Sequence, residues 1–600
     1  MMNGKGKPMK TPLSLLTALL LAPLIALDAE DFHVDIRRGD DANPGSSALP
    51  LKTISKAVAL AGAGDTVRIA TGVYREAVSM EQSGTAEHPV RFEAELAAQV
   101  VVTGADRLTE WRKEPSDSGE NVYSAEWPHR FIGWSKTGTH PGDDYHQLIG
   151  RAEQVFVNGY PLRQVLSFDK LTRGTFFPDL AGKRLYVQAA NNARLDQPSE
   201  RVEASVRGTV WDVKADHVHT RGITFRYSAA QAQTGMLRLK GRGAMVEDCV
   251  FEGANSQGAD FCGPDQMARR CVFQDNGQDG FTASGAHRLL MTECVTRNNN
   301  TKNFNRGWGG GGNKIALSRG VVIEKSQFLA NRGNGIWFDI GNEDCTVRHC
   351  LIADNEGAGI FYEISYGLHA HDNVIVGNGL LSGPGAWGAN GAISLSSSPH
   401  CVVERNLMVG NKEGFQFREQ RRTTPRIAGK AGSPEEWVWN HDHNIRNNLI
   451  AYNQDAQVRG WFAVDDERHW PLALQRLAAP KPDRPENDLA ADYQAQRKDG
   501  APAGLSLEKL DLVFEGNFYA AHPGQGLFHW GPEWDRHKKY TTLDDVRAEL
   551  KLETGRVAES LAFANPHARD YRLPPDNPAL KQGCYPRGDV PGTKLGALQP

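Results

Sequence analysis

The stretch 335–363 (GIWFDIGNEDCTVRHCLIADNEGAGIFYE) contains two near-copies of one short motif, 24 residues apart. The copies are Gly335-Ile-Trp-Phe-Asp339 and Gly359-Ile-Phe-Tyr-Glu363, and each ends in a carboxylate. Strands on consecutive turns of a parallel β-helix lie about 4.8 Å apart. If each copy forms one such strand, Asp339 and Glu363 are stacked neighbours on the same face.

A longer repeat surrounds this motif. Short, mostly apolar triplets begin at positions 249, 271, 294, 326, 350, 373, 406 and 448, at spacings of 22 to 24 residues with three longer intervals. This period is typical of a solenoid in which some turns carry loop insertions. Every repeat after the first places an asparagine five residues on, which predicts a ladder of stacked amides at one turn. Its members are Asn276, Asn299, Asn331, Asn355, Asn378, Asn411 and Asn453.

The cysteines follow the same repeat. Eight cysteines in an exported protein would ordinarily suggest disulfides. Half of them instead occupy the first position of the repeat, which recurs at the same place on each turn. We therefore expect small buried thiols, stacked one above another, at Cys249, Cys271, Cys294 and Cys350.

These patterns predict an all-β protein built on a right-handed parallel β-helix, a pectin-lyase-like solenoid. Residues 50–76 indicate a helix capped by Thr53, then a turn and a strand, so we expect a helix that closes the N-terminal end of the solenoid. Residues 108–204 depart from the repeat and predict an inserted β-sandwich. The expected divisions are a signal peptide (1–29), the N-terminal cap and first turns (30–107), the sandwich (108–204), the main β-helix (205–460), an insertion (461–505) and the C-terminal turns and cap (506–600).

The N-terminus and the overall charge limit where the protein works and what it binds. Three lysines, an apolar run over 11–27 and then acidic residues are typical of a secretory signal peptide. A membrane anchor is the alternative, although a run of 17 residues interrupted by Pro23 is short for one. We expect a secreted or periplasmic protein without membrane attachment after signal removal. A net charge of −4 argues against nucleic acid as a partner, and no pattern indicates an oligomeric state.

Alternation along each strand identifies the side chains that leave the core. We expect Ile336 and Phe338 to point inward and their neighbours Trp337 and Asp339 to face solvent; in the next turn Phe361 and Glu363 do the same. Lys314 points outward if Ile315 is a core residue. Aromatic, amide and charged side chains on this face suit a groove that binds sugar rings. The candidate substrate-binding residues are Trp308, Asn313, Lys314, Trp337, Tyr366, Gln416 and Arg418, and the candidate catalytic residues are Asp339 and Glu363.

The two acids suggest glycosidic bond cleavage. The carboxyl groups of a retaining glycosidase lie roughly 5 Å apart, which is close to the spacing of neighbouring turns. Two carboxylates so close cannot both ionise easily, so one pKa rises. Lys314 favours the ionised form of Asp339, which leaves Glu363 to stay protonated. This predicts Asp339 as the nucleophile and Glu363 as the acid and then the base.

Three other hypotheses stay open. The acids can pair with Lys314 and Arg418 in an ordinary charge network. They can instead bind calcium while Lys314 abstracts the C5 proton of a uronate, as in a polysaccharide lyase. The protein can also be a non-catalytic carbohydrate-binding β-helix. Outside the lyase hypothesis we expect no cofactor and no metal, because His369 and His371 flank a strand without a third ligand at a fixed spacing.

The layout resembles a known group of enzymes. Gly64-Asp-Thr-Val67 and Gly72-Val-Tyr-Arg-Glu76 in the cap, the inserted sandwich, and an acid on each of two successive turns look like the β-helix glycoside hydrolases of family 120, which are β-xylosidases. Family 141 enzymes, which act on fucosides or xylan, are similar in architecture. The resemblance implies a retaining hydrolase acting on xyloside- or fucoside-like plant or algal saccharides, with Asp339 as nucleophile and Glu363 as acid/base. The second motif continues as Ile360-Phe-Tyr-Glu-Ile-Ser-Tyr-Gly367, which departs from the xylosidase pattern and leaves the sugar open.

Overall fold

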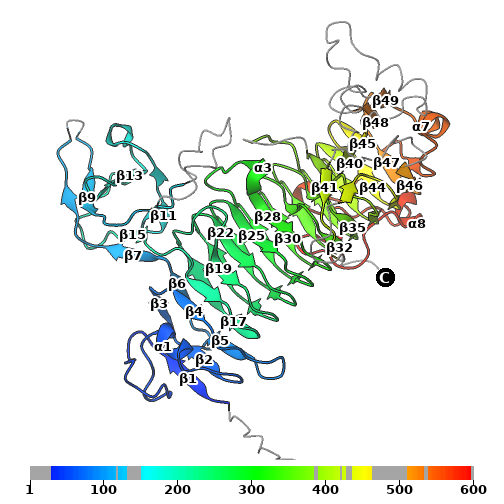
Figure 1. Cartoon of the computed structure of the whole chain (residues 1–600). Coiled ribbons are helices and arrows are strands. Elements are labelled where there is room, and N and C mark those ends of the chain that lie inside the picture. Colours follow the sequence, from blue (N-terminus) through cyan, green and yellow to red (C-terminus); the bar gives the residue numbers. More distant parts are fainter. Residues whose placement is uncertain are drawn as a thin grey trace, which may run out of the picture.

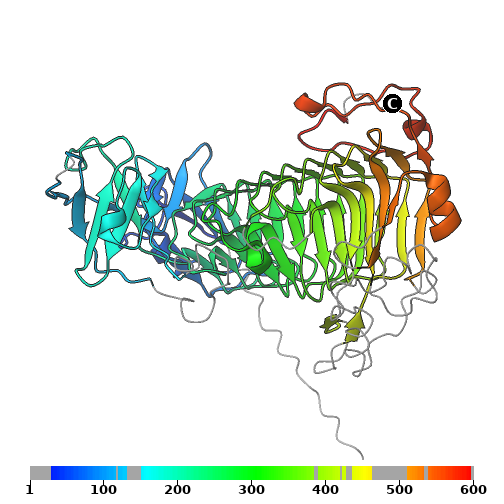
Figure 2. The ribbon, with the colours of Figure 1, turned by 90° about the horizontal axis from the view of Figure 1, so that it is seen from above.

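The computed structural model of the chain describes residues 29–116, 119–131, 150–383, 389–418, 422–427, 436–462, 510–532 and 538–595. Within them, three sheets of thirteen strands each run along one elongated core, and a smaller two-sheet unit stands beside its N-terminal part (Figure 1). Seen from above, the strands of successive turns lie side by side along the long axis (Figure 2). The predicted all-β class and parallel β-helix are confirmed. The expected signal peptide and most of the insertion at 461–505 lie outside the described residues.

Sheet 1 contains both copies of the opening motif, as β31 and β34. Its strands are parallel except for the last, which runs antiparallel to its neighbour. In spatial order they are β4 (Val78–Met80), β16 (Trp211–Val213), β19 (Gly235–Leu239), β22 (Gln257–Phe261), β25 (Asp279–Ser284), β28 (Gly311–Ala316), β31 (Ile336–Phe338), β34 (Ile360–Glu363), β37 (Gly391–Ser396), β40 (Glu413–Arg418), β45 (Ala456–Phe462), β48 (Gly526–Pro532) and β49 (Lys538–Tyr540).

Sheets 2 and 3 complete each turn. Sheet 2 comprises β3 (Gly72–Tyr74), β6 (Val100–Thr103), β18 (Ile223–Arg226), β21 (Val250–Glu252), β24 (Val272–Gln274), β27 (Val295–Arg297), β30 (Gln327–Leu329), β33 (Leu351–Ala353), β36 (Val374–Val376), β39 (Leu407–Val409), β44 (Leu449–Ala451), β47 (Phe518–Ala520) and β50 (Arg556–Val557). Sheet 3 comprises β1 (Asp31–Val34), β2 (Thr66–Ile69), β5 (Val90–Ala94), β17 (Val218–Arg221), β20 (Met245–Glu247), β23 (Met267–Arg269), β26 (Leu290–Thr292), β29 (Val322–Glu324), β32 (Glu343–Arg348), β35 (Tyr366–His371), β38 (Val402–Glu404), β43 (His443–Arg446) and β46 (Leu512–Glu515).

The asparagine ladder between sheets 2 and 1 fixes how one turn stacks on the next. The side chain of Asn355 accepts hydrogen bonds from the backbone N–H and the amide of Asn331, at 3.0 and 2.9 Å. Its own amide donates to Asn378 Oδ1 at 2.9 Å and to the carbonyl of Phe328 at 3.0 Å. The predicted ladder is confirmed over Asn276, Asn299, Asn331, Asn355, Asn378, Asn411 and Asn453, all of them buried.

A column of glycines lies beside this ladder at the start of several sheet 1 strands, among them β31 and β34. A Cβ at Gly335 would lie 2.8 Å from both Asn355 Nδ2 and the carbonyl oxygen of Gly359. Gly359 meets the same restriction from the carbonyl of Ala392, at 2.6 Å. The glycine that opens each copy of the motif is therefore required by the close approach of the next turn.

The interior is apolar and contains the predicted thiols. Phe225, Phe251 and Phe273 stack along the axis with ring centroids 5.3 and 4.8 Å apart. All eight cysteines are free, and the four at repeat starts are buried, as expected. The interior therefore holds together without disulfides, through stacked apolar columns that no single turn could bury alone.

The N-terminal end is closed by a short helix, and the two-sheet unit follows it. Thr53 caps α1 (Ile54–Val58), with its side chain accepting from the N–H of Lys56. Strands outside the solenoid lie where the sequence predicts the inserted sandwich. One sheet holds β7 (Ala105–Leu108), β15 (Val202–Ser205), β10 (Val155–Val157) and β11 (Tyr160–Pro161); the other holds β8 (Arg112–Lys113), β9 (Tyr123–Glu126), β14 (Arg184–Gln188), β13 (Thr175–Asp179) and β12 (Arg163–Gln164).

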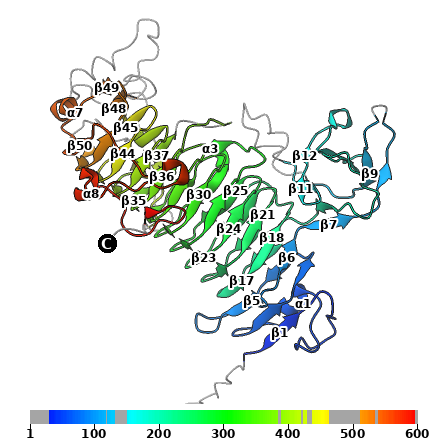
Figure 3. The same ribbon diagram turned by 180° about the vertical axis from the view of Figure 1, so that it is seen from behind.

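The C-terminal segment, residues 558–595, packs across the outer face of sheet 2 (Figure 3). Leu561, Tyr571 and Tyr585 bury against outward side chains of five successive sheet 2 strands, from Leu351 on β33 to Phe518 on β47. No helix among the described residues is long and apolar enough to cross a membrane. The remaining helices and strands are η1 (Phe168–Lys170), α3 (Arg306–Gly309), β41 (Arg422–Thr424), β42 (Glu436–Val438), α7 (Leu543–Leu550), η4 (Pro566–Ala568) and α8 (Pro578–Lys581).

Replacing Asn355 by alanine is expected to destabilise the solenoid by about 3 kcal/mol or more, because it leaves several buried backbone and amide groups without partners. The measurement is equilibrium urea unfolding followed by tryptophan fluorescence. Arg332→Ala is the matched control, because Arg332 is exposed in the same series of turns. Equal effects of the two substitutions would contradict a stabilising role for the ladder.

Candidate active site

Two columns of outward side chains on sheet 1 form the candidate site. Trp337 of β31 pairs in register with Phe361 of β34, and Phe338 pairs with Tyr362, so Asp339 lies opposite Glu363. Further along, Glu363 pairs with Ser396 and Ser396 with Arg418. The site therefore consists of one column of Lys314, Trp337, Phe361, Ser394 and Gln416, and an adjacent column of Asp339, Glu363, Ser396 and Arg418.

A chain of charged and polar contacts connects the two acids. The ammonium of Lys314 lies 2.9 Å from Asp339 Oδ2 and 4.2 Å from the centre of the Trp337 ring. The indole N–H of Trp337 in turn donates to Glu363 Oε2 at 3.2 Å. Lys314 therefore neutralises one acid while Trp337 orients the other.

The two acids differ in their surroundings. Glu363 is 2% exposed, whereas the side chain of Asp339 is 20% exposed and ion-paired. Burial, followed by the negative charge of Asp339, raises the pKa of Glu363 to about 7, and the cations Arg418, Arg422 and Lys314 offset part of that rise. Glu363 can therefore hold a proton near neutral pH that an ordinary glutamate would have lost.

The outward residues are less exposed than the sequence suggested. Trp337, Phe361, Gln416 and Arg418 point away from the solenoid core, as the alternation predicts, yet each is at most 3% exposed. Trp337 and Phe361 pack together with Ala389, which belongs to an insertion between sheets 2 and 1. The expectation that they face solvent is therefore wrong, because neighbouring side chains and this insertion cover them.

Contacts between side chains also bury the part of the site that β37 and β40 contribute. The guanidinium of Arg418 lies 5.2 Å from the centre of the Phe361 ring, and the hydroxyl of Ser394 donates to Gln416 Oε1 at 2.7 Å. These groups point outward from the core but are already in contact with one another. They lie beside the two acids, of which Asp339 is the more accessible.

Trp308 lies in the segment that approaches Lys314. The carbonyl of Trp308 accepts from Gln233 Nε2 at 2.8 Å, and a Cβ on the next residue, Gly309, would lie 3.5 Å from Lys314 Cδ. The Trp308 ring is part-buried and packs toward Phe304, with centroids 6.3 Å apart. The structure thus brings this segment to the site.

Two predicted substrate-binding residues lie elsewhere. Asn313 pairs in register with Phe281, a core residue, so its side chain belongs to the inward column, and it is 1% exposed. Only Lys314 and not its neighbour can point outward, because adjacent residues of a strand point to opposite faces. Tyr366 opens β35 on sheet 3, where the Arg426 guanidinium lies 4.1 Å from its ring centre. Both expectations are wrong for positional reasons.

A third acid, missed from the sequence, lies on the turn before Lys314. Asp279 starts β25 and is 1% exposed. Burial raises its pKa to about 7, and the positive charge of Lys314 counteracts part of that effect. Asp260 lies on β22, one turn before Asp279, and accepts a hydrogen bond from the Thr282 hydroxyl at 2.6 Å. The sequence does contain a signal for Asp279. Asp279 directly precedes Gly280, which belongs to the glycine column, and the residue before each of these glycines points outward.

Within the part of the chain that the structure describes, the acids of the site have no third histidine, cysteine or acidic ligand close enough to share a metal ion with them. Among the described residues, three such side chains come within coordinating distance only at His400, His441 and Asp442, on sheet 3 turns. Of the C-terminal residues Trp530, Glu533 and Trp534, whose place relative to the groove the sequence leaves open, the last two lie outside the described residues. Trp530 itself is buried in the core.

Family comparisons support the fold. A family described as "Right handed beta helix region" matches residues 235–408, and one described as "Protein of unknown function (DUF1565)" matches residues 37–82. The first agrees with the predicted hand of the solenoid. No curated protein sequence matches the chain.

Several solved structures are similar to this chain to different degrees. A structure of XylC in complex with xylose has a TM-score of 0.60 at 16% identity, covering 84% of this chain and 86% of that chain. A structure described as a glycoside hydrolase has a TM-score of 0.45 at 12% identity, covering 84% and 97%. A mannuronic acid specific family 6 polysaccharide lyase from human gut microbiota has a TM-score of 0.44 at 10% identity, covering 88% and 92%. The resemblance to β-helix glycoside hydrolases is confirmed in its fold.

Asp339→Asn is expected to lower the pKa of Glu363 below about 7, because it removes a neighbouring negative charge that disfavours the ionised form. The measurement is the pH titration of the Glu363 carboxyl by difference infrared spectroscopy, with Glu363→Gln to assign the band. Asp344→Asn is the control: Asp344 is exposed, pairs with Arg319, and has a left-handed backbone that asparagine tolerates. An unchanged or higher pKa in Asp339→Asn would refute the electrostatic coupling.

Proposed function

We propose that this protein is a glycoside hydrolase that retains anomeric configuration, with Asp339 as the nucleophile and Glu363 as the acid/base. The observation that carries the proposal is the pair itself: two acids opposite each other on adjacent strands of one outward face, one ion-paired and accessible, the other buried with a raised pKa. Adjacent strands lie about 4.8 Å apart, which fits the roughly 5 Å between the carboxyl groups of retaining enzymes.

The reaction proceeds in two displacements. Asp339 attacks the anomeric carbon while the glycosidic C–O bond breaks, and Glu363 gives its proton to the leaving oxygen. The sugar is then held on Asp339 as an ester. Glu363, now ionised, takes a proton from water as that water attacks the anomeric carbon and releases Asp339. The sugar leaves with its original anomeric configuration.

Lys314 and Trp337 prepare the two acids for these roles. The ammonium of Lys314 pairs with Asp339 and holds the nucleophile in position beside the leaving group. The Trp337 N–H holds one oxygen of Glu363, which leaves the other oxygen to carry the proton. Both partners come from sheet 1 strands, so the solenoid fixes them relative to the acids.

The substrate class follows from the chemistry and the fold. A pair in which Glu363 is buried and only Asp339 is partly exposed suits the end of a saccharide better than the middle of a long polymer. A protein of the same fold, XylC, has been solved with xylose, which favours a xyloside- or fucoside-like plant or algal saccharide as substrate. We place the enzyme outside the cytoplasm, in the secreted or periplasmic fraction, because its apolar N-terminal run follows a lysine cluster.

The contacts of Lys314 favour the hydrolase proposal over the lyase hypothesis. A lyase base must accept a proton, whereas the Lys314 nitrogen makes two contacts suited to an ammonium cation, with the Asp339 carboxylate and the Trp337 ring.

Glu363→Gln and Asp339→Asn should each lower kcat/KM on alkyl glycosides at least about a thousandfold, because each removes a group essential to bond breaking. Azide should restore turnover of an activated aryl glycoside by Asp339→Ala and yield the glycosyl azide of inverted configuration. Asp344→Asn is the control and should keep full activity. Products with an unsaturated, ultraviolet-absorbing end, formed only in the presence of calcium, would replace this proposal with a lyase.

The pH dependence should separate the two acids. Glu363 must be protonated to assist a poor leaving group, so kcat/KM for an alkyl glycoside should fall as pH rises through about 7. An aryl glycoside with a nitrophenolate leaving group needs no proton, so its rate of glycosylation should stay level over the same range. Parallel profiles for the two substrates would remove Glu363 from the role of acid.

A further inference from the structure

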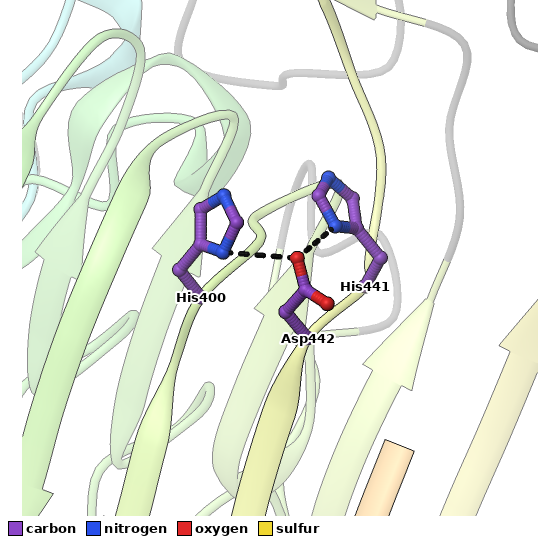
Figure 4. A group of neighbouring side chains, drawn as sticks. All are labelled: His400, His441 and Asp442. Atoms are coloured by element: carbon purple, nitrogen blue, oxygen red, sulfur yellow. Dashed lines mark hydrogen bonds and ion pairs between the residues drawn. The ribbon is translucent and has the colours of Figure 1, made fainter. Parts of the chain in front are cut away.

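Two histidines and an aspartate converge at the turns that lead into sheet 3, away from the two acids (Figure 4). Val402 of β38 pairs in register with Asn444 of β43, so His400 lies opposite Asp442 on the next turn. His441 directly precedes Asp442. The group therefore spans two consecutive turns of the solenoid.

The two imidazoles share one carboxylate oxygen. His400 Nδ1 lies 3.1 Å and His441 Nδ1 2.7 Å from Asp442 Oδ2, and the three ligand atoms all lie within 4.8 Å of one another. Figure 4 shows both rings turned toward that oxygen. Metal–ligand bonds of about 2.0–2.1 Å in a tetrahedral site separate ligand atoms by roughly 3.3 Å, so small side-chain rotations bring these atoms to coordinating positions.

The backbone holds this arrangement before any ion binds. His400 and Asp442 both have a left-handed backbone, with φ of 60° and 54°. The N–H of His400 donates to the His441 carbonyl at 3.0 Å, and that of Asp442 donates to the Leu510 carbonyl at 2.9 Å. The Trp439 ring lies 4.4 Å from the His441 ring. The turns thus place the ligands, and little conformational entropy is lost on coordination.

Another histidine pair on the same sheet shows a different arrangement. His369 Nε2 lies 3.2 Å from Glu404 Oε1, and His371 Nδ1 lies 2.7 Å from Asp372 Oδ2. Each ring has its own carboxylate, and Asp372 is also bound by Arg405 at 3.0 Å. Convergence on a shared oxygen therefore distinguishes His400 and His441 from these neighbours.

We propose that His400, His441 and Asp442 bind a divalent transition-metal ion of the zinc class. Imidazole nitrogens with one carboxylate suit Zn²⁺, Ni²⁺ or Co²⁺, whereas Ca²⁺ and Mg²⁺ prefer all-oxygen sites. Asp511, at the same position on the following turn, is placed beside Asp442 by the pairing of His443 with Leu512 and can supply a fourth ligand. Water can take the same place.

The ion would fasten two turns at a place where the chain leaves the solenoid. Between His400 and His441 the chain completes one turn through β38, β39 and β40 and then forms the hairpin of β41 and β42 outside the three sheets. A metal bound to the start of that turn and to the residues that follow the hairpin restrains the return of the chain to sheet 3. Because the ion binds only the folded turns, it stabilises the protein by an amount that grows with the logarithm of the free ion concentration above the dissociation constant.

The test uses untagged protein dialysed against EDTA and then titrated with Zn²⁺ by calorimetry and with Co²⁺ by visible absorption. We expect one ion per chain, with tetrahedral or five-coordinate Co²⁺ bands and a rise in melting temperature. His400→Ala and His441→Ala should each weaken binding at least about tenfold, whereas the control His369→Ala should bind like the parent protein.

Two outcomes would overturn the proposal. One is a dissociation constant weaker than about 1 mM for both ions. The other is tight binding that His400→Ala and His441→Ala leave unchanged. His400 is exposed and His441 lies on an outer turn, so the variants should fold, which their melting temperatures without metal will verify. The readouts involve no catalysis and stand apart from the proposed hydrolase activity.

Discussion

The fixed stacking of one turn on the next is the constraint on which the rest of this structure depends. The buried amide of Asn355 bonds the turns on both sides of it, and the glycine at 335 lets the following turn approach within contact distance. Because the spacing is set by backbone hydrogen bonds, any two side chains at the same position of consecutive turns are held about 4.8 Å apart. Asp339 and Glu363 inherit their proximity from that geometry.

The same stacking gives Asp339 and Glu363 different electrostatic surroundings. Each outward column places unlike groups in contact, so Lys314 meets both a carboxylate and an indole ring. Glu363 sits one turn further on, covered by aromatic and guanidinium groups and away from direct contact with the ammonium. One strand spacing thus separates a partly exposed, ion-paired acid from a buried acid whose pKa is raised.

The sequence predicted those features that repeat and missed those that depend on distant segments. The period, the ladder and the outward direction of Asp339 and Glu363 follow from local alternation. Asn313 was misplaced because alternation allows only one of two adjacent residues to point outward, and the lysine next to it takes that position. Asp279 and His400 were missed because their neighbours lie on other turns, 20 to 40 residues away, and register rather than motif brings them together. Burial of the site depends on an insertion whose path no pattern indicates.

The C-terminal segment changes how the solenoid should unfold. In a stack of repeats each turn touches only its neighbours, so turns can open one at a time from an end. Here residues 558–595 pack on five successive turns at once, from Leu351 to Phe518. Opening any one of these turns exposes apolar surface of the C-terminal segment, which packs on all of them. This part of the molecule should therefore unfold as a single cooperative unit. The turns nearer the N-terminus can still open one at a time.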